Sequence, residues 1–266
     1  ALALLEWMSL YELDEHPKSL DMPWLTWQVS AQQLLDTLIT DASTNTAELT
    51  ASNGSSKQTN KKRLLIDLSA TCRNDLKTGI ERVARALLLA LTENPPEGYS
   101  VAPIYLSDIG NVWHYRYAHT YLANLQNNIS QQEDSVVEPG HGDVILGLDI
   151  SGEMLIQAAS SGLFKRYRTA GVSTFFMVHD LLPISMPEVF PATAKEGHTR
   201  WLEAVMTMDG VICVSKSVAK DMELWIKNQP AKNKNSNFLI QWSHHGADVV
   251  NSSPSKGLPK YANDVL

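Results

Sequence analysis

A histidine and an aspartate directly follow a very apolar run of the chain. The run Phe175–Val178 leads into His179 and Asp180, and Pro183 ends the segment. A polar pair in this position is costly to bury without hydrogen-bond partners, so we expect it to face a cleft or to join a polar network. A histidine beside a carboxylate is also a frequent arrangement at functional sites. The alternative is a structural His–Asp pair that closes the end of a strand.

A second candidate site is the loop from Ser69 to Gly79, which joins the first predicted strand to the first predicted helix. A helix that starts there offers unpaired N–H groups and the positive end of its dipole to an anion. Thr78 and Gly79 stand at this start, where glycine allows a ligand to approach the backbone, and Arg82 and Arg85 follow on the first turns. An ordinary strand-to-helix turn with solvated arginines explains the same residues, because a lone Thr-Gly pair is a weak motif.

Further polar residues follow other predicted strands. Asp149 ends a Gly-Leu-Asp turn, where it would bind the hydroxyl groups of a ligand or cap a helix that begins near Gly152. Ser215 precedes an amphipathic stretch and is predicted to cap that helix. His244 and His245 are adjacent, but no cysteine or third histidine lies at ligand spacing. We therefore expect no metal site.

The elements that must position these residues are short apolar runs alternating with amphipathic stretches. Continuous apolar runs of this kind fit a parallel sheet covered on both faces. Apolar side chains recur at helical spacing from Ile80 to Leu91 and again from Val218 to Ile226. This alternation predicts a doubly wound, Rossmann-like α/β domain, in which ligands bind at the carboxyl ends of the strands. The predicted strands are Leu64–Leu68, Val101–Leu106, Asp143–Leu148, Ser173–His179, Gly210–Val214 and Phe238–Trp242.

The chain divides into three parts by composition. Residues 1–41 are rich in leucine and tryptophan, with leucines at helical spacing, and read as a helical segment, either the tail of an upstream module or an arm docked on the sheet. Residues 42–62 are polar and predict a flexible linker, because such a stretch buries too little surface to offset its ordering entropy. Residues 63–266 form the predicted α/β domain. The tryptophans Trp7, Trp24 and Trp27 are expected to pack in helices rather than to stack on sugars.

Composition excludes several classes of protein. With 29 acidic residues against 22 basic ones and a net charge of -7, the chain has no basic stripe for a nucleic-acid backbone. Two distant cysteines, Cys72 and Cys213, predict neither a disulfide framework nor a zinc site. No apolar run approaches the roughly 20 residues that a membrane-spanning helix needs, and the first residues do not form a signal peptide. We expect a cytoplasmic protein.

Six segments, in this order and spacing, resemble the N-terminal domain of glycosyltransferase family 4, especially bacterial mannosyltransferases of O-antigen and capsule synthesis. The resemblance extends from about Arg63 to Asp248. The segments are Leu64–Ala70, Thr78–Val83, Gly142–Asp149, Met177–Pro183, Asp209–Ser215 and His244–Asp248.

The resemblance implies a GT-B fold, in which two Rossmann-like domains face each other across a cleft. Such enzymes transfer a sugar with retention of anomeric configuration, usually without a metal or other cofactor. The N-terminal domain mainly holds the acceptor, and the C-terminal domain, with its E-x7-E motif and basic pair, mainly holds the nucleotide. The present chain ends before that second domain, so we expect the chain alone to be inactive. The implied partners are a nucleotide-sugar, such as GDP-mannose, and a glycan acceptor; with a lipid-linked acceptor, the intact enzyme would work at the inner face of the cytoplasmic membrane.

The resemblance also implies roles for individual residues. His179 would hydrogen-bond the transferred sugar, and Asp180 would orient His179 or bind an acceptor hydroxyl. Thr78, Gly79 and Arg82 would face the donor phosphate and the acceptor. Three further residues at the cleft would contact the substrates: Asp149, Ser215 and His245.

Two rival functions remain for the same fold. Dinucleotide-dependent enzymes need G-x-G-x-x-G after the first strand, and that fingerprint is absent. A non-catalytic glycan-binding or scaffolding domain of a larger assembly would have the same sequence features. Trp113, Tyr115 and Tyr117, which we place in a polar insertion after the second strand, would in either case be available to stack on an acceptor glycan.

Overall fold

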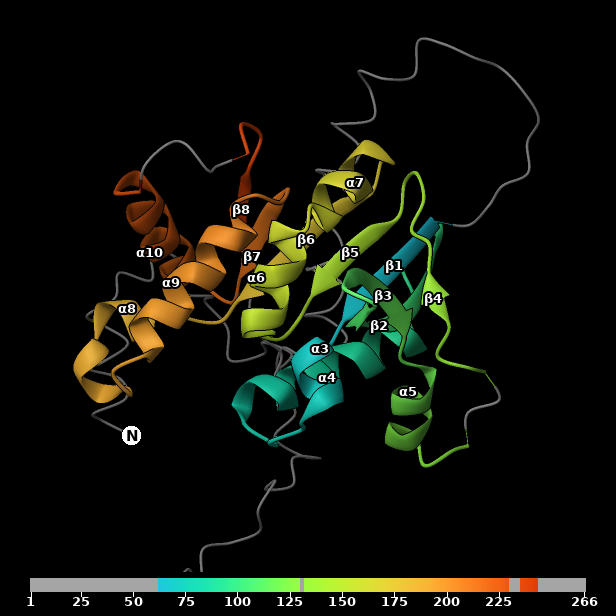
Figure 1. The fold of residues 1–266 in the computed structure, drawn as a ribbon. Coiled ribbons are helices and arrows are strands. Elements are labelled where there is room, and N and C mark those ends of the chain that lie inside the picture. Colours follow the sequence, from blue (N-terminus) through green and yellow to red (C-terminus); the bar gives the residue numbers. More distant parts are fainter. Residues whose placement is uncertain (1–61, 130–131, 230–234, 244–266) are drawn as a thin grey trace, which may run out of the picture.

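A computed structural model describes residues 62–129, 132–229 and 235–243 (Figure 1). The predictions for residues 1–61, including the helical segment and its tryptophans, and for His245 concern residues outside these ranges. The first strand, β1, begins at Lys62.

One sheet with eight strands in the order β4-β3-β2-β1-β5-β6-β7-β8 forms the centre of the described domain (Figure 1). In the series β2-β1-β5-β6-β7-β8 each strand is parallel to its neighbours. Strands β3 and β4 are antiparallel additions at the β2 edge. All six predicted strands are present, so the predicted α/β class is confirmed. The strands are β1 Lys62–Asp67, β2 Tyr99–Ile109, β3 Val112–Tyr117, β4 Val136–Val137, β5 Val144–Gly147, β6 Ser173–Val178, β7 Gly210–Cys213 and β8 Leu239–Trp242.

The prediction missed the hairpin that joins β2 to β3. The pairing of β2 with β1 ends at Ile104, opposite Asp67. Strand β2 continues for five more residues and pairs with β3 up to Ile109, opposite Val112. Gly110 and Asn111 make the turn with φ angles of 62° and 64°. Positive φ at both turn residues matches the right-handed twist of the two strands, which is why glycine and asparagine occur in such turns.

Helices cover both faces of the sheet, as a doubly wound fold requires. On one face α4 and α5 pack on a cluster that contains Leu64, Ile66 and Leu146. On the other face α6, α7, α9 and α10 pack on a cluster around Leu65, Ile145 and other apolar side chains (Figure 1). The helices are α3 Ser69–Arg73, α4 Gly79–Glu93, α5 His119–Leu125, α6 Gly152–Ser160, α7 Leu163–Thr169, α8 Leu182–Ser185, α9 Ala194–Val205 and α10 Lys216–Lys227, with a 3-10 turn, η1, at Pro187–Val189.

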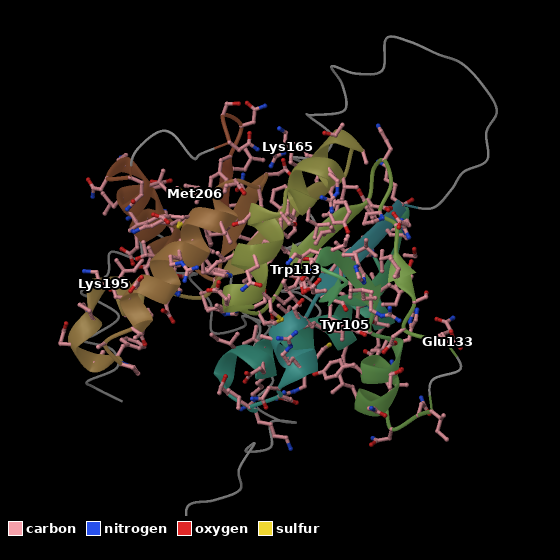
Figure 2. All side chains as sticks on the ribbon, in the orientation of Figure 1. Tyr105, Trp113, Glu133, Lys165, Lys195 and Met206 are labelled. Carbon is pink, nitrogen blue, oxygen red and sulfur yellow. The ribbon has the colours of Figure 1, made fainter. Side chains whose placement is uncertain are left out.

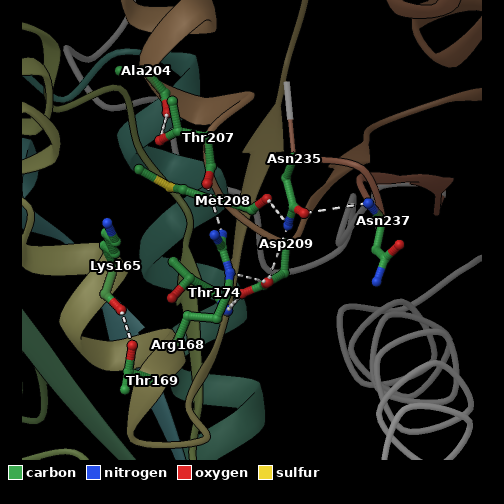
Figure 3. A network of polar contacts seen from close by, with 10 residues as sticks. All are labelled: Lys165, Arg168, Thr169, Thr174, Ala204, Thr207, Met208, Asp209, Asn235 and Asn237. Carbon is green, nitrogen blue, oxygen red and sulfur yellow. Dashed lines mark hydrogen bonds and ion pairs between the residues drawn. The ribbon is translucent and has the colours of Figure 1, made fainter. Parts of the chain in front are cut away.

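Polar contacts hold the amino-terminal edge of the sheet together (Figure 3). Asp209, directly before β7, accepts hydrogen bonds from Arg168 Nε at 2.9 Å and from Thr174 N in β6 at 2.8 Å. Asn235, before β8, donates from Nδ2 to Met208 O at 2.8 Å. Side chains at this edge therefore serve the packing of the strands, and the opposite, carboxyl-terminal edge is the one available for function.

None of the helices within the described ranges combines the length and the apolar character needed to span a bilayer.

Candidate functional site

The order of the strands reverses between β1 and β5, and polar residues follow both strands at this point. The chain runs outward from β1 to β2 and then returns to β5 on the other side of β1. In open α/β sheets ligands bind outside the carboxyl ends of the strands at such a switch point. The backbone pairing continues past the strand ends, since Leu148 N donates to Asp67 O at 3.0 Å. The loops after β1 and β5 are thereby held side by side.

Asp67, at the end of β1, is completely buried and carries three hydrogen bonds. Ser69 N donates to its Oδ1 at 2.9 Å, the Ser69 hydroxyl donates to the same atom, and Tyr115 Oη donates to Oδ2 at 2.7 Å. Burial raises the pKa of Asp67, although the hydrogen bonds from Ser69 and Tyr115 lower it. The sequence analysis did not select Asp67 as a site residue. The sign that could have identified it is its position as the one acidic residue in an apolar strand.

Asp149 is nearly as buried and connects the loop after β5 to α3. Its Oδ2 accepts hydrogen bonds from Thr71 N at 2.7 Å and from Thr71 Oγ1 at 2.8 Å. Burial and the nearby charge of Asp67 raise the pKa of Asp149, against hydrogen bonds from Thr71. The N-cap alternative for Asp149 is wrong, because α6 begins at Gly152 with Ser151 as its N-cap residue.

Two buried oxygens at this edge have no well-formed hydrogen bond to any of the residues that the structure describes. They are Asp149 Oδ1 and Ser151 Oγ, and the Ser151 residue is only 4% exposed. Buried polar atoms are rarely left unpaired in proteins, so a water molecule or a ligand hydroxyl is the expected partner.

His179 follows β6 at the same edge. Its Nε2 lies 2.9 Å from Leu148 O, so the neutral ring carries its proton on Nε2 and donates to that carbonyl. Burial lowers the pKa of His179, which favours the neutral imidazole near pH 7. The carboxylate of Asp180 accepts from the backbone N of Leu182, the first residue of the short helix α8, at 3.0 Å. His179 and Asp180 therefore lie at the end of an apolar strand, as predicted from the sequence. The structure adds that His179 contacts the loop after β5.

A second histidine, His198 in α9, supports this loop and was not predicted. Its Nε2 lies 3.1 Å from Asp180 O, and its ring packs on Trp201 with the ring centroids 5.5 Å apart. Burial lowers the pKa of His198 as well. The helical spacing of His198 and Trp201 was the available signal, but it did not reveal their partner in a distant loop.

The predicted anion site at the start of α4 is exposed. Thr78 is the N-cap of α4, and both its N and its Oγ1 lie 2.6 Å from Glu81 Oε2. A Cβ built on Gly79 would meet no atom within 4 Å, so the space around this glycine is open. Arg82 is exposed on the first turn. The helix start is thus accessible to a ligand, although Glu81 places a carboxylate at it.

Ser215 confirms one prediction made from the sequence. Its Oγ accepts from Val218 N at 3.2 Å and caps α10. Beyond β7 and β8 the pairing also continues, since Ser243 N donates to Cys213 O at 2.9 Å. The structure therefore brings Asp149, His179 and Ser215 to one edge of the sheet, each after a different strand.

The predicted stacking role of Trp113, Tyr115 and Tyr117 is not supported by their positions. Tyr115 is completely buried and donates to Asp67, while Trp113 and Tyr117 pack against the core cluster of the α6 face. The three residues form strand β3 rather than a polar insertion, so β-pairing turns their rings onto the sheet.

The fold and the edge constellation define a Rossmann-like α/β domain with its polar site at the switch point of the sheet. No protein-family model and no solved structure matches the chain. It is, however, similar to serotype-specific mannosyltransferases WbdA of Escherichia coli. One is 31% identical over 244 residues, which cover 91% of this chain and 29% of that protein. Another is 32% identical over 207 residues, which cover 77% of this chain and 24% of that protein.

These comparisons confirm the predicted resemblance to bacterial mannosyltransferases. The matched region covers 29% and 24% of the length of these two curated relatives, so the chain spans about a quarter of their length.

Proposed function

We propose that the chain is the acceptor-side half of a retaining glycosyltransferase with a GT-B fold. The intact protein would move mannose from a nucleotide-sugar, GDP-mannose being the first candidate, to a glycan acceptor of a bacterial surface polysaccharide. The observation that carries the proposal is the similarity to mannosyltransferases over 91% of the chain. A second GT-B half of the intact protein would supply most of the nucleotide site. The reaction would take place in the cytoplasm, at the inner face of the membrane if the acceptor is lipid-linked.

The positions of the edge residues support a role for each of them in this reaction. His179, whose Nε2 donates to Leu148 O, is a neutral group in a fixed position that would orient the transferred sugar. The start of α4, with Thr78, Gly79 and Arg82, is exposed and would face the diphosphate. Asp149 and Ser151 offer buried oxygens to hydroxyl groups beside the switch point.

No strong general base is needed for this reaction class. In a retaining transfer through an oxocarbenium-like state, the leaving diphosphate can accept the proton of the attacking hydroxyl while the old bond breaks. The protein then contributes by positioning the reactants and stabilising charge. A histidine whose pKa is lowered by burial suits such a positioning role, since it stays neutral and keeps one hydrogen-bond geometry.

The test is a transfer assay on the intact protein with a panel of sugar nucleotides and simple mannoside acceptors. We expect transfer from one donor and a loss of about 100-fold or more in kcat for His179→Ala, by analogy with the loss of other positioning groups. His179→Gln can retain a hydrogen bond to Leu148 O and separates positioning from folding. His141→Ala, which changes an exposed histidine at the opposite edge of the sheet, is the matched control and should act as the wild type.

Either of two results would contradict the proposal. Full activity of His179→Ala would remove the histidine from the site, and the absence of turnover with every donor would favour a non-catalytic glycan-binding or scaffolding domain.

A further inference from the structure

A cavity of about 480 Å³ lies next to the switch point, and of the candidate loop Ser69–Gly79 only Ser69, Cys72 and Arg73 line it. Its walls are α3, the end of β2 beyond its pairing with β1, and the first turns of α5. Figure 2 places Tyr105 in this region, between α3 and α5. The volume falls in the range of about 300–1,000 Å³ that is usual for sites of small organic ligands.

The side chains that line the cavity combine aromatic rings with neutral hydrogen-bonding groups. Tyr105 and Tyr121 contribute rings, and Ser107, Thr120 and Asn124 contribute hydroxyl and amide groups. Rings bind the apolar C–H face of a flat, hydroxylated molecule, and hydroxyl and amide groups bind its rim. This is the chemistry that recognises a sugar ring.

The charges that line the cavity disfavour an anionic ligand. Two carboxylates, Asp108 and Asp134, line it together with one guanidinium, that of Arg73. Carboxylates at the wall repel a phosphate or a diphosphate, but they accept hydrogen bonds from sugar hydroxyls. The cavity therefore suits a neutral sugar and not the nucleotide.

A hydrogen-bonded network connects this cavity to the switch point. Ser69 lines the cavity, donates its hydroxyl to Asp67, and accepts a hydrogen bond from Leu106 N at 2.7 Å. In the same short helix, Thr71 is bonded to Asp149. Helix α3 is thus a fixed wall between the cavity and the loop after β5.

The position of the cavity sets the size of the ligand. Strands β2 and β6 are separated by β1 and β5, which makes three strand spacings, or about 14 Å, between the cavity and the His179 loop. A single hexose cannot contact both ends of this span. A ligand that occupies the cavity and also reaches His179 must be an oligosaccharide.

We propose that this cavity binds a non-reacting sugar ring of an oligosaccharide acceptor, so that the site selects acceptors longer than one residue. The proposal rests on the proposed function for the position of the reacting end. Sugar binding in the cavity itself requires no turnover and can be tested separately.

The binding arm uses ligand-observed NMR titration of the chain with methyl α-mannoside and with α-1,2-, α-1,3- and α-1,6-linked mannotrioses. We expect at least one trisaccharide to bind more tightly than the monosaccharide. Tyr105→Ala should weaken that binding about tenfold, through loss of a ring contact. Tyr105→Phe should keep most of the binding, because the ring remains.

Asn124→Ala should weaken trisaccharide binding as well. Asn128→Ala, four residues further along and outside the cavity lining, is the matched control. Thermal melting checks that each variant is folded.

The activity arm uses the intact enzyme and the same acceptors. Tyr105→Ala should raise the KM for the trisaccharide and leave the hydrolysis of the donor by water unchanged, a split that a merely unstable protein would not show. If Tyr105→Ala leaves both trisaccharide affinity and KM at wild-type values, the proposal is wrong even if transfer occurs. If the trisaccharides bind through Tyr105 but no donor is turned over, the cavity assignment stands and the proposed transferase function falls.

Discussion

At the scale of single residues, the site depends on two aspartates that the fold keeps out of water. Asp67 and Asp149 are 0% and 1% exposed, and each is held by hydroxyl and backbone donors of α3. Burial raises the pKa of both carboxyl groups and favours their protonated forms, and the charge of Asp67 raises the pKa of Asp149 further. Together they hold α3, which separates the switch point from the neighbouring cavity, so their ionisation state affects both.

Asp149→Asn should change how the stability of the protein depends on pH. Because the pKa of Asp149 is raised above its ordinary value of 3.8, the folded state holds this proton more tightly than the unfolded state does. The stabilisation that Asp149 adds to the free energy of unfolding is complete below pH 3.8. It is lost as pH rises through the pKa of the folded state, with a slope of up to about 1.4 kcal/mol per pH unit. Asparagine can still accept from Thr71 and does not ionise.

The measurement is the melting temperature of wild type and Asp149→Asn from pH 4 to pH 8. As pH rises, the melting temperature of the wild type should fall relative to that of Asp149→Asn. A constant difference across this range would show that Asp149 does not titrate abnormally.

At the scale of elements, local sequence patterns predict six of the strands and two of the three longest described helices, whereas α9 was not identified. The apolar runs and the helical stripes identified β1, β2, β5, β6, β7, β8, α4 and α10, and Ser215 was identified as the cap of α10. Elements whose residues alternate or are short were not identified. Strand β3 was interpreted as a polar insertion because histidine and arginine alternate with its aromatic residues, and only Tyr115 is buried. Helix α3 has five residues, too few for a periodic signal.

Gly147→Ala should destabilise the protein strongly, because Gly147 lies where β5 passes β6 with no room for a side chain. A Cβ at this position would stand 2.2 Å from ring atoms of Phe176, whose side chain is fully buried in the core. Overpacking of this kind typically costs about 1–3 kcal/mol. Urea denaturation should show the loss, and Gly79→Ala, where a Cβ meets nothing within 4 Å, is the matched control. Equal midpoints for the two variants would contradict the packing argument.

At the scale of the whole molecule, ion pairs connect segments that are far apart in sequence. Asp143, before β5, accepts from Arg63 N at 2.9 Å and from Arg63 Nε at 3.0 Å in β1. The same arginine donates to Tyr117 Oη at 2.9 Å, which joins the hairpin to the centre of the sheet. A comparable pair, Arg168 and Asp209, lies further along the same edge.

Asp143→Ala should cost more stability than Asp209→Ala. The Asp143 side chain is 7% exposed and that of Asp209 is 21% exposed, so water screens the second pair more effectively. We expect about 2–3 kcal/mol for Asp143→Ala, since buried backbone donors also lose their acceptor. Free energies of unfolding in urea decide the order, and a larger loss for Asp209→Ala would contradict it.

The sequence by itself determined the class of the fold and the location of His179 and Asp180, because both depend on local patterns: the length and composition of apolar runs, and the polar residues that end them. The resemblance to mannosyltransferases was also readable from the order of the motifs. Only the tertiary structure decided which polar residues meet. Thr71 and Asp149 are 78 positions apart, and His198 reaches the loop of Asp180 from α9. Such contacts depend on strand order and register, which local propensity does not encode. The same pairing turned Tyr115 into the core and left Tyr105 on the wall of a cavity.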